Sequence, residues 1–558
     1  MRILLVTHSF NGLCQRLFCE LTALGHEVSI EFDIADSVTE EAVRLFQPEL
    51  IVAPFLKRAI TEAIWSRHTC LIVHPGIVGD RGPSALDWAI RNALGEWGVT
   101  VLQAEAEMDA GPVWAAATFP LRAARKASIY RHEVTEAAVR AVTAAVNRQF
   151  EPNFKPERVP GEAHATMRQS DRGIDWQHDD SATVLAKLNA ADGFPGVADV
   201  LFGEPCHLFD AWPEAIFKGA PGSLLGHRET AICRATADGA VWIGHVKAAG
   251  GIKLPTTLAF PAAAELPELA LAGYWKSPTP TWQDIAYEEA AGVGFLSFEF
   301  YNGAMSTSQC RRLTEAFAWA ATRPTKVIVL RGGSDFWSNG IHLNTIEAAE
   351  SPADESWANI NAIDDLAEAI LRCERQLTVA AVGGNAGAGG CFLARATDFV
   401  WVRDGVMLNP HYKNMGNLYG SEFWTYLLPP RVGAAGAETI MRHRLPMTAA
   451  EAVKLGFYDA RLPGPGFTVD VARRAAELAA APDIDAQLAA KRAKRAADEA
   501  VKPLSAYRDE ELKEMRRNFY GFDPSYHVAR YHFVSRSAHS WTPRHLARHR
   551  DLDWKTPE

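Results

Sequence analysis

The stretch IVHPGIVGDRGP, residues 72–83, decides the fold of the first part of the chain. It overlaps an apolar run, residues 70–73, that is typical of a buried strand, and it places His74 where that strand ends in a Pro-Gly turn. Ligands of parallel α/β sheets bind beyond the carboxyl ends of the strands. A histidine there can reach a substrate and exchange protons, although a structural, hydrogen-bonded role explains His74 alone equally well.

Similar apolar runs occur on both sides of this strand, and amphipathic stretches such as residues 14–24 separate them. The runs are residues 3–6, 49–53 and 99–103. Their alternation predicts a parallel sheet with helices on both faces. No GxGxxG motif follows the first strand, so a dinucleotide is not indicated.

The bulk composition sets limits on the class of protein. A chain of 558 residues is too long for a single hydrophobic core and suggests about three domains. Its net charge of -10 argues against nonspecific nucleic-acid binding. The eight cysteines are scattered without zinc-like spacing, which predicts reduced core residues and no metal centre. No signal-peptide pattern and no bilayer-length apolar stretch is present, so we expect a cytoplasmic protein without a membrane partner.

The chain shows three successive patterns of apolar and polar residues, followed by a C-terminal tail. From about residue 171 to 272 the apolar runs are short and alternating, which predicts a small β-rich, OB-like barrel domain. The stretch KSPTPTW, residues 276–282, marks a domain boundary. After it, the pattern typical of α/β domains returns and continues to about residue 482. The sequence thus predicts an α/β multidomain protein with domains at residues 1–160, 161–275 and 284–480, a linker at 276–283, and a helical tail at 481–558.

A second segment strengthens the catalytic interpretation of His74. In WGVTVLQAEAEMDAGPVW, residues 97–114, Asp109 stands in a carboxylate-rich turn and can orient and charge-stabilise the imidazole. The motifs HPG, RGPSALDWAI, WGVTVLQ and MDAGPVW resemble the folate-dependent formyltransferases, and the similarity covers about the first half of the chain. This resemblance implies formyl-tetrahydrofolate as the formyl donor, with His74 and Asp109 at the family's catalytic positions.

One position departs from that family. Ile72 stands where the formyltransferases have a catalytic asparagine, whose amide would donate a hydrogen bond to the oxyanion of the tetrahedral intermediate. Losing such a donor typically costs about 3 kcal/mol of transition-state stabilisation. Either other groups donate to the oxyanion, or the acceptor is not an amine; a thiolate is a stronger nucleophile and needs less help.

The third domain contains two glycine-rich turns that each follow an apolar strand, in residues 326–343 and 378–402. Backbone N–H groups at such turns can polarise one carbonyl oxygen, although close packing explains either turn alone. Together with LSFEFYNGAMSTSQCRRL, residues 296–313, they resemble the crotonase (enoyl-CoA hydratase/isomerase) superfamily. The resemblance implies a CoA thioester ligand whose oxyanion is held by the N–H groups of Ile341 and Gly389.

The catalytic positions of this domain also differ from the hydratases. Phe392 and Tyr412 stand where the hydratases carry two glutamates, so water addition is not expected. Glu422 follows in a segment where the superfamily usually has glycine. A buried phenol and a carboxylate can form an acid–base pair; the alternative is a tyrosine and a surface glutamate that never meet.

A basic stretch in the tail has two interpretations. It can neutralise the phosphates of CoA, or it can be a solvated helix face. Its residues are Lys491, Arg492, Lys494 and Arg495.

The combination of both modules resembles a family of hydrogenase-maturation factors, and the segment at residues 506–534 is similar to that family's C-terminus. The resemblance implies formyl transfer from tetrahydrofolate to CoA and decarbonylation of formyl-CoA to CO for a [NiFe]-hydrogenase, with hydrogenase-maturation proteins among the partners. Two alternatives stay open. One is a formyl-tetrahydrofolate hydrolase or amine formyltransferase with a CoA-binding regulatory module, and the other is a non-catalytic scaffold.

Overall fold

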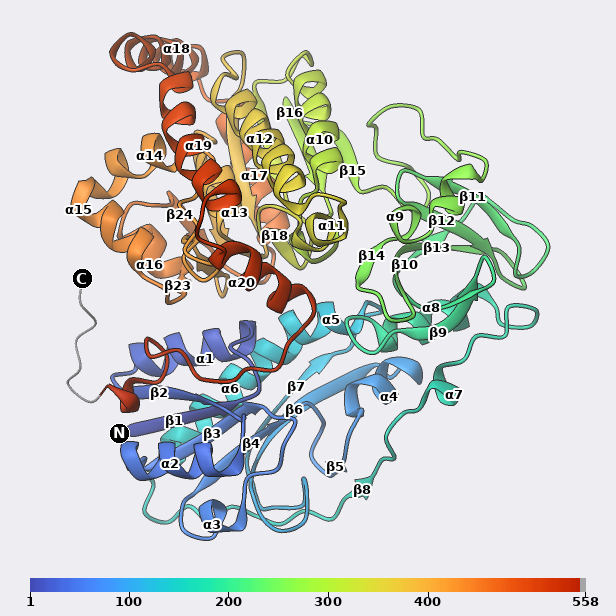
Figure 1. Ribbon diagram of the computed structural model, residues 1–558, viewed down its shortest axis with the longest axis vertical. Coiled ribbons are helices and arrows are strands. Elements are labelled where there is room, and N and C mark those ends of the chain that lie inside the picture. Colours follow the sequence, from blue (N-terminus) through green and yellow to red (C-terminus); the bar gives the residue numbers. More distant parts are fainter. Residues whose placement is uncertain (552–558) are drawn as a thin grey trace. The chain divides into compact units, whose positions relative to one another are not determined.

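The first sheet carries the predicted apolar runs as buried strands. In the computed structural model, which describes residues 1–551, its strand order is β2-β1-β3-β4-β6-β7. Helices α1 and α6 lie on one face and α2 on the other (Figure 1). The strands are β1 (Arg2–Thr7), β2 (Glu27–Phe32), β3 (Leu50–Phe55), β4 (Cys70–His74), β6 (Glu96–Gln103) and β7 (Val113–Pro120), and the helices are α1 (Gly12–Ala23), α2 (Asp36–Phe46), α4 (Ala85–Arg91) and α6 (Thr135–Arg148).

This sheet is mixed, whereas the sequence predicted a parallel one. Strands β1 to β4 are parallel, but β6 runs antiparallel to β4 and β7 antiparallel to β6. The connection at residues 104–112 is too short for the crossover that a parallel β7 would need, so the chain returns as an antiparallel neighbour.

A second, antiparallel sheet follows in the order β11-β12-β13-β10-β9. This is the small β-rich domain that the sequence predicted, and in the described pairing β11 and β9 are its edge strands. Helix α8 (Ser181–Ala191) packs against it. The strands are β9 (Val197–Leu201), β10 (Glu204–Glu214), β11 (Leu224–Arg228), β12 (Ala231–Ala235) and β13 (Ala240–Ala248).

The third α/β region contains two sheets. The larger has the order β15-β16-β17-β19-β21-β24 and is parallel except for β15, and the smaller has the order β18-β20-β22-β23. The strands are β15 (Ile285–Ala290), β16 (Val293–Phe298), β17 (Val327–Arg331), β18 (Phe336–Ser338), β19 (Leu377–Val382), β20 (Asn385–Gly387), β21 (Phe399–Arg403), β22 (Met407–Asn409), β23 (Met447–Thr448) and β24 (Ala460–Leu462).

The helices of this region begin at sequence signals that favour helix starts. Ser306 and Gln309 form a capping box at α10 (Thr307–Ala320), and Ser351 caps α12 (Pro352–Leu371), which has proline in its first turn. The short helix α13 (Gly389–Arg395) packs into a large apolar core, and α17 (Phe467–Ala479) packs into a second one.

The tail is helical over α18 (Ile484–Val501), α19 (Leu504–Tyr520) and α20 (Ser525–Val534). The chain divides into two compact units: unit 1 comprises residues 1–251, 255–268 and the segment from 538, and unit 2 comprises residues 252–254 and 269–537. The last described segment, 538–551, therefore belongs to unit 1 (Figure 1), where the backbone oxygen of Leu546 accepts a hydrogen bond from Ile30 N of β2 at 3.0 Å.

Some negative findings concern the described residues. Within residues 1–551, no helix is long and apolar enough to cross a membrane, and no group of three or more His, Cys, Asp or Glu side chains is arranged to hold a metal ion. All eight cysteines are unpaired.

Candidate active sites

His74 is the last residue of β4, and its side chain is buried between two carboxyl groups. Its Nε2 lies 2.7 Å from Asp80 Oδ2, at hydrogen-bond distance. Its Nδ1 lies 3.6 Å from Asp109 Oδ2, within ion-pair but not hydrogen-bond distance. A β-carbon at Gly76 would lie 2.4 Å from both His74 Nε2 and Asp80 Oδ2, so the turn needs glycine there.

Asp109 reaches His74 because its loop folds back along β4. The strand register sets Gln103, the last residue of β6, opposite Leu71, so the loop at residues 104–112 must return toward the end of β4. Asp109 adopts a left-handed conformation with φ of +55°, and its Oδ2 accepts a hydrogen bond from Gly82 N at 3.1 Å.

Ile72 lies on the same face of β4 as His74, since side chains two residues apart on a strand share a face. Its side chain is half-buried between the neighbouring strand positions of Ala53 and Leu102. The sequence reasoning missed Asp80, although this aspartate stands inside the stretch that singled out His74. An acid six residues further along a turn gave no sign that it would return to the imidazole.

The site in unit 2 brings Tyr412 and Glu422 together. The Tyr412 hydroxyl donates to Glu422 Oε2 at 2.6 Å, and both side chains are buried. Phe392 stacks on Tyr412 with ring centroids 5.9 Å apart and an angle of 10° between the planes. Because Glu422 is buried and contacts Tyr412, the alternative of a surface glutamate that never meets the tyrosine is wrong.

Glu422 also contacts the predicted oxyanion position. A β-carbon at Gly389 would lie 1.9 Å from Glu422 Oε1, so only glycine leaves room for the carboxyl group. A β-carbon at Gly340, next to Ile341, would lie 3.5 Å from Gly389 N, which brings the two glycine-rich turns side by side. Glu422 itself has a φ of +59°, a conformation that non-glycine residues seldom adopt.

Two further buried carboxyl groups hold the backbone around Glu422. Asp364 of α12 accepts hydrogen bonds from Ser421 Oγ at 2.7 and 2.9 Å and from Glu422 N at 2.9 Å. Glu511 of α19 accepts from Thr425 N at 2.8 Å and from its hydroxyl at 2.6 Å. Sequence patterns did not point to either acid, because both stand in charged helical stretches that are typical of solvent-exposed helix faces.

Burial dominates the electrostatics of this cluster. It raises the pKa of Glu422 well above the ordinary value, and the charge of Asp364 raises it further. Burial likewise raises the pKa of Tyr412. It raises the pKa of Asp364 to about 6 and the pKa of Glu511 to about 8. The phenol therefore stays protonated, and Asp364 and Glu511 exchange protons near neutral pH.

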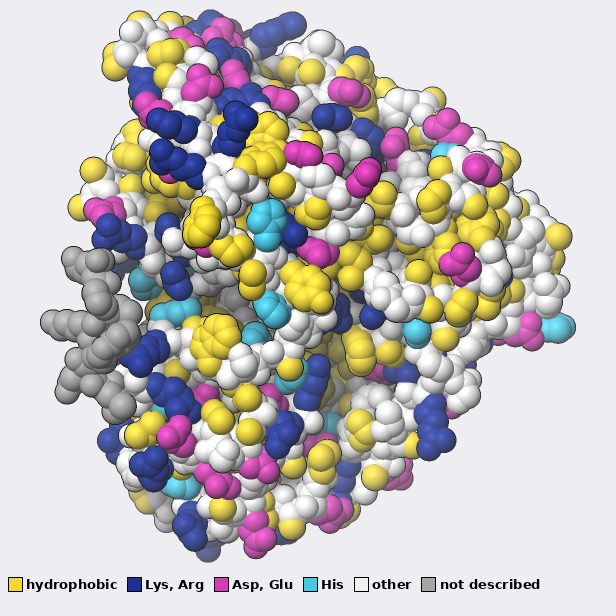
Figure 2. Space-filling view, in the orientation of Figure 1, with side chains coloured by type: hydrophobic (Ala, Val, Ile, Leu, Met, Phe, Trp, Pro, Cys, Tyr) yellow, Lys and Arg dark blue, Asp and Glu magenta, His cyan; other side chains and the backbone are white. Residues whose placement is uncertain are grey.

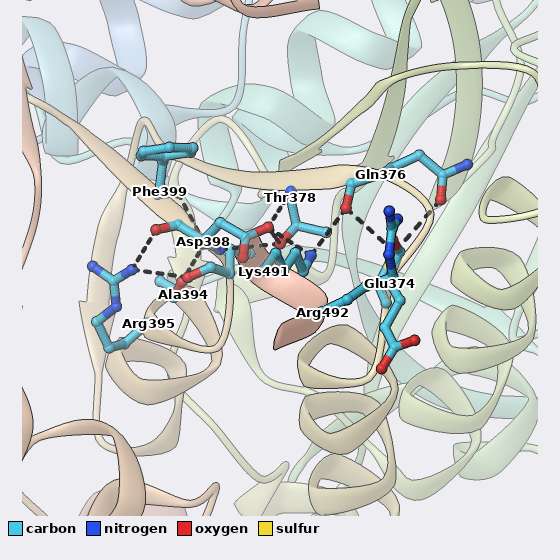
Figure 3. A network of polar contacts seen from close by, with 11 residues as sticks. Glu374, Gln376, Thr378, Ala394, Arg395, Asp398, Phe399, Lys491 and Arg492 are labelled. Atoms are coloured by element: carbon cyan, nitrogen blue, oxygen red, sulfur yellow. Dashed lines mark hydrogen bonds and ion pairs between the residues drawn. The ribbon is translucent and has the colours of Figure 1, made fainter. Parts of the chain in front are cut away.

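The basic stretch predicted to meet CoA phosphates lies on α18. Lys491 Nζ donates a hydrogen bond to Asp398 Oδ2 at 2.6 Å, and Figure 3 shows both side chains with Arg492 next to Lys491. Arg495 is buried and donates to a tyrosine hydroxyl, while Lys494 is exposed. Lys and Arg side chains gather over α18 and α19 on the face in Figure 2. Lys491 and Arg495 thus fasten the helix, and the phosphate role of the stretch stays a prediction.

Three parts of the chain match known protein families. Residues 31–146 match formyl transferase, residues 166–260 match its C-terminal domain, and residues 291–534 match enoyl-CoA hydratase/isomerase. Hydrogenase maturation factor HoxX from Bradyrhizobium diazoefficiens is 53% identical over 99% of this chain and 97% of its own length. A methionyl-tRNA formyltransferase from Dechloromonas aromatica is 25% identical over 41% of this chain and 76% of its own.

A solved structure covers the whole chain. The crystal structure of HypX from Aquifex aeolicus in complex with tetrahydrofolic acid has a TM-score of 0.97 and 48% identity, and the match covers 100% of both chains. Fold and sites together define a protein in which a formyltransferase part and an enoyl-CoA hydratase-like part share one polypeptide. The chain belongs to the family of hydrogenase maturation factors that includes HoxX and HypX. The predicted family and the α/β multidomain fold are confirmed.

Proposed function

We propose that unit 1 transfers formyl from formyl-tetrahydrofolate to the thiol of CoA, and that unit 2 splits the formyl-CoA into CO and CoA. The CO would become the iron ligand of a [NiFe]-hydrogenase, so hydrogenase-maturation proteins are the expected partners. Family membership and the tetrahydrofolate complex of HypX support the assignment. We assign the first step to residues 1–160 with 161–275, and the second to residues 284–480.

In the first step, the sulfur of CoA attacks the formyl carbon, the bond from that carbon to the folate nitrogen breaks, and the thiol proton ends on that nitrogen. His74 is placed to take and return this proton, with Asp109 beside its Nδ1. Ile72 leaves no side-chain donor for the oxyanion at its position. A thiolate acceptor suits such a site because it is a strong nucleophile.

In the second step, the formyl proton moves to sulfur as the carbon–sulfur bond breaks. Ionised Glu422 accepts the formyl proton while Tyr412 donates its own proton to sulfur. Their 2.6 Å hydrogen bond then returns a proton from Glu422 to Tyr412, so none is gained or lost. Burial makes Glu422 a strong base when it is ionised, and the apolar Phe392 helps to keep water out.

The observation that carries the proposal is the contact between Glu422 and Gly389. It sets a buried carboxyl group beside the backbone where a crotonase-like site would bind the thioester oxygen. A proton acceptor at this place is close to the carbonyl carbon, which in a formyl thioester bears the hydrogen to be removed.

The test is to incubate the purified protein with formyl-tetrahydrofolate and CoA and to measure CO by haem-protein absorbance. We expect CO from the wild type. We expect formyl-CoA without CO from the double variant Tyr412→Phe, Glu422→Gln. His74→Ala should lose formyl transfer and still decarbonylate added formyl-CoA. The proposal is wrong if the wild type forms no CO, or if the double variant forms as much CO as the wild type. Formate in place of CO would favour the formyl-tetrahydrofolate hydrolase.

A further inference from the structure

Asp80 lies between two imidazoles and uses one carboxyl oxygen for each. Its Oδ2 is 2.7 Å from His74 Nε2, and its Oδ1 is 2.9 Å from His164 Nε2. The exposed fraction of the side chain is 5% for His74 and 2% for Asp80, but 40% for His164. The three residues therefore form a chain of contacts that runs from the buried imidazole to the protein surface.

The backbone holds His164 in place against this turn. The short strand β5 (Asp80–Arg81) pairs with β8 (Glu162–Ala163), and His164 N donates to Arg81 O at 2.8 Å. Gly82 has a φ of +92°, and a β-carbon there would lie 2.8 Å from His164 O. The loop that contains His164 is thus fitted to the turn after His74, although more than 80 positions separate His164 from Asp80 in the sequence.

The same turn closes the other approaches to His74 Nε2. A β-carbon at Gly76 would touch both His74 Nε2 and Asp80 Oδ2, so the backbone covers their contact. On the other side of the ring, Nδ1 faces Asp109. The remaining charged group of the turn is Arg81, which pairs with Glu107 at 3.3 Å.

We propose that Asp80 and His164 form a proton relay that connects His74 with solvent; the relay rests on the proposed role of His74 in formyl transfer. When the thiol binds in its protonated form, His74 takes the thiol proton and gives it to the leaving nitrogen, and no proton enters or leaves. When the thiol binds already ionised, His74 must supply a proton of its own. It then gives its Nδ1 proton to the leaving nitrogen and takes one from Asp80 at Nε2, and Asp80 regains its own from water through His164. A turn of the imidazole ring brings the new proton to the substrate side before the next reaction.

The second contact has the length of an ion pair without hydrogen-bond alignment, because Asp80 Oδ1 has no hydrogen-bond partner. A rotation of the His164 ring, whose side chain is 40% exposed, would align this contact as a hydrogen bond. Asp80 and His164 act through His74 and are positioning residues. The proposal concerns proton supply and leaves the substrate contacts of His74 unchanged.

The test compares His164→Ala with the wild type in formyl transfer to CoA across pH. Because a thiol ionises at about pH 8.5, the relay matters above this pH. We expect rates within about twofold of the wild type at pH ~7 and a loss of about tenfold or more at pH ~9.5. Imidazole in the buffer should restore the lost activity. His178→Ala, which removes a histidine 2.8 Å from Asp175 on the surface of unit 1, is the matched control and should leave the profile unchanged.

Several outcomes would overturn the relay. If His164→Ala loses the same fraction of activity at all pH values and imidazole does not restore it, His164 acts through packing alone. If His164→Ala has the wild-type pH profile, His164 has no role in the reaction. Decarbonylation of added formyl-CoA reports whether the variant is folded. A wild type that transfers no formyl refutes the proposed function instead. In that case NMR tests the relay, through the rate at which the His74 Nε2 proton exchanges with water. The relay predicts slower exchange in His164→Ala, and an unchanged exchange rate would refute it.

Discussion

At the scale of single residues, each candidate site sets a polar pair against an apolar side chain. Ile72 shares a face of β4 with His74, and Phe392 stacks on Tyr412. Glu422 fills the space that Gly389 leaves open. The observed position of the Glu422 carboxyl group thus requires glycine at position 389.

Gly389→Ala should separate these contributions. The added β-carbon would lie 1.9 Å from Glu422 Oε1 and must displace the carboxyl group. We expect decarbonylation of added formyl-CoA to fall by about 100-fold or more, with formyl transfer unchanged. The measurement is the rate of CO release.

Gly464→Ala is the control for this prediction. The nearest atom to a β-carbon at Gly464 is 3.7 Å away, so this variant should keep the wild-type rate. Full activity of Gly389→Ala would show that the observed position of Glu422 is not needed for the reaction.

At the scale of elements, helices α12 and α19 hold the segment around Glu422 through buried carboxyl groups. Asp364 and Glu511 accept hydrogen bonds from the backbone and hydroxyl groups of this segment. Such an arrangement keeps Glu422 in its left-handed conformation, which an isolated loop would not retain. It also links the stability of unit 2 to pH.

The stability of the protein should fall as the pH rises from about 5 to about 8, and Glu511→Gln should flatten this slope. Burial raises the pKa of Glu511 from 4.5 to about 8, so the folded state binds its proton more tightly than the unfolded state. The stabilisation is complete below pH 4.5 and is lost as the pH rises through about 8. Its size is on the order of a few kcal/mol. Urea unfolding across this pH range measures it.

Glu510→Gln provides the comparison on the same helix. Glu510 is exposed and pairs with Lys502, so its replacement should keep the wild-type slope. If Glu511→Gln retains the full slope, another group carries the pH dependence.

At the scale of the whole molecule, the end of the chain completes the first unit. Burial alone would raise the pKa of Glu31 in β2, but hydrogen bonds from His549, Thr542 and Arg550 bring it below the ordinary value. His549 Nε2 lies 2.8 Å from Glu31 Oε2, and neither side chain is exposed to solvent. A charge in the second strand is therefore neutralised by residues more than 500 positions away.

His549→Ala should destabilise unit 1 by about 2–3 kcal/mol, because it removes a hydrogen-bond partner of the buried Glu31 carboxylate. His178→Ala removes a histidine at the same 2.8 Å from a carboxylate, but its side chain is 83% exposed, and it should cost less than about 0.5 kcal/mol. Hydrogen exchange of the peptides that contain β1 and β2 reports the difference. Equal protection in both variants would contradict the structural role of the tail.

Local patterns were enough to predict much of this protein. The apolar runs, the Pro-Gly turn after His74 and the glycine-rich turns each concern residues close in sequence, so hydrophobic period and turn chemistry identify them. The motifs also placed His74, Asp109, Tyr412 and Glu422 in two sites, and the structure brings each pair within ion-pair or hydrogen-bond distance.

Tertiary structure alone decided the partners that surround these groups. Asp80 with His164, Glu422 with Gly389 and Glu31 with His549 join residues that no local period connects. The acids Asp364 and Glu511 have the sequence context of solvent-exposed helix residues, and only packing against the segment around Glu422 buries them. The sequence determined which groups could react, and the long-range contacts decided which of them are buried, paired and able to exchange protons, because burial depends on residues distant in the chain.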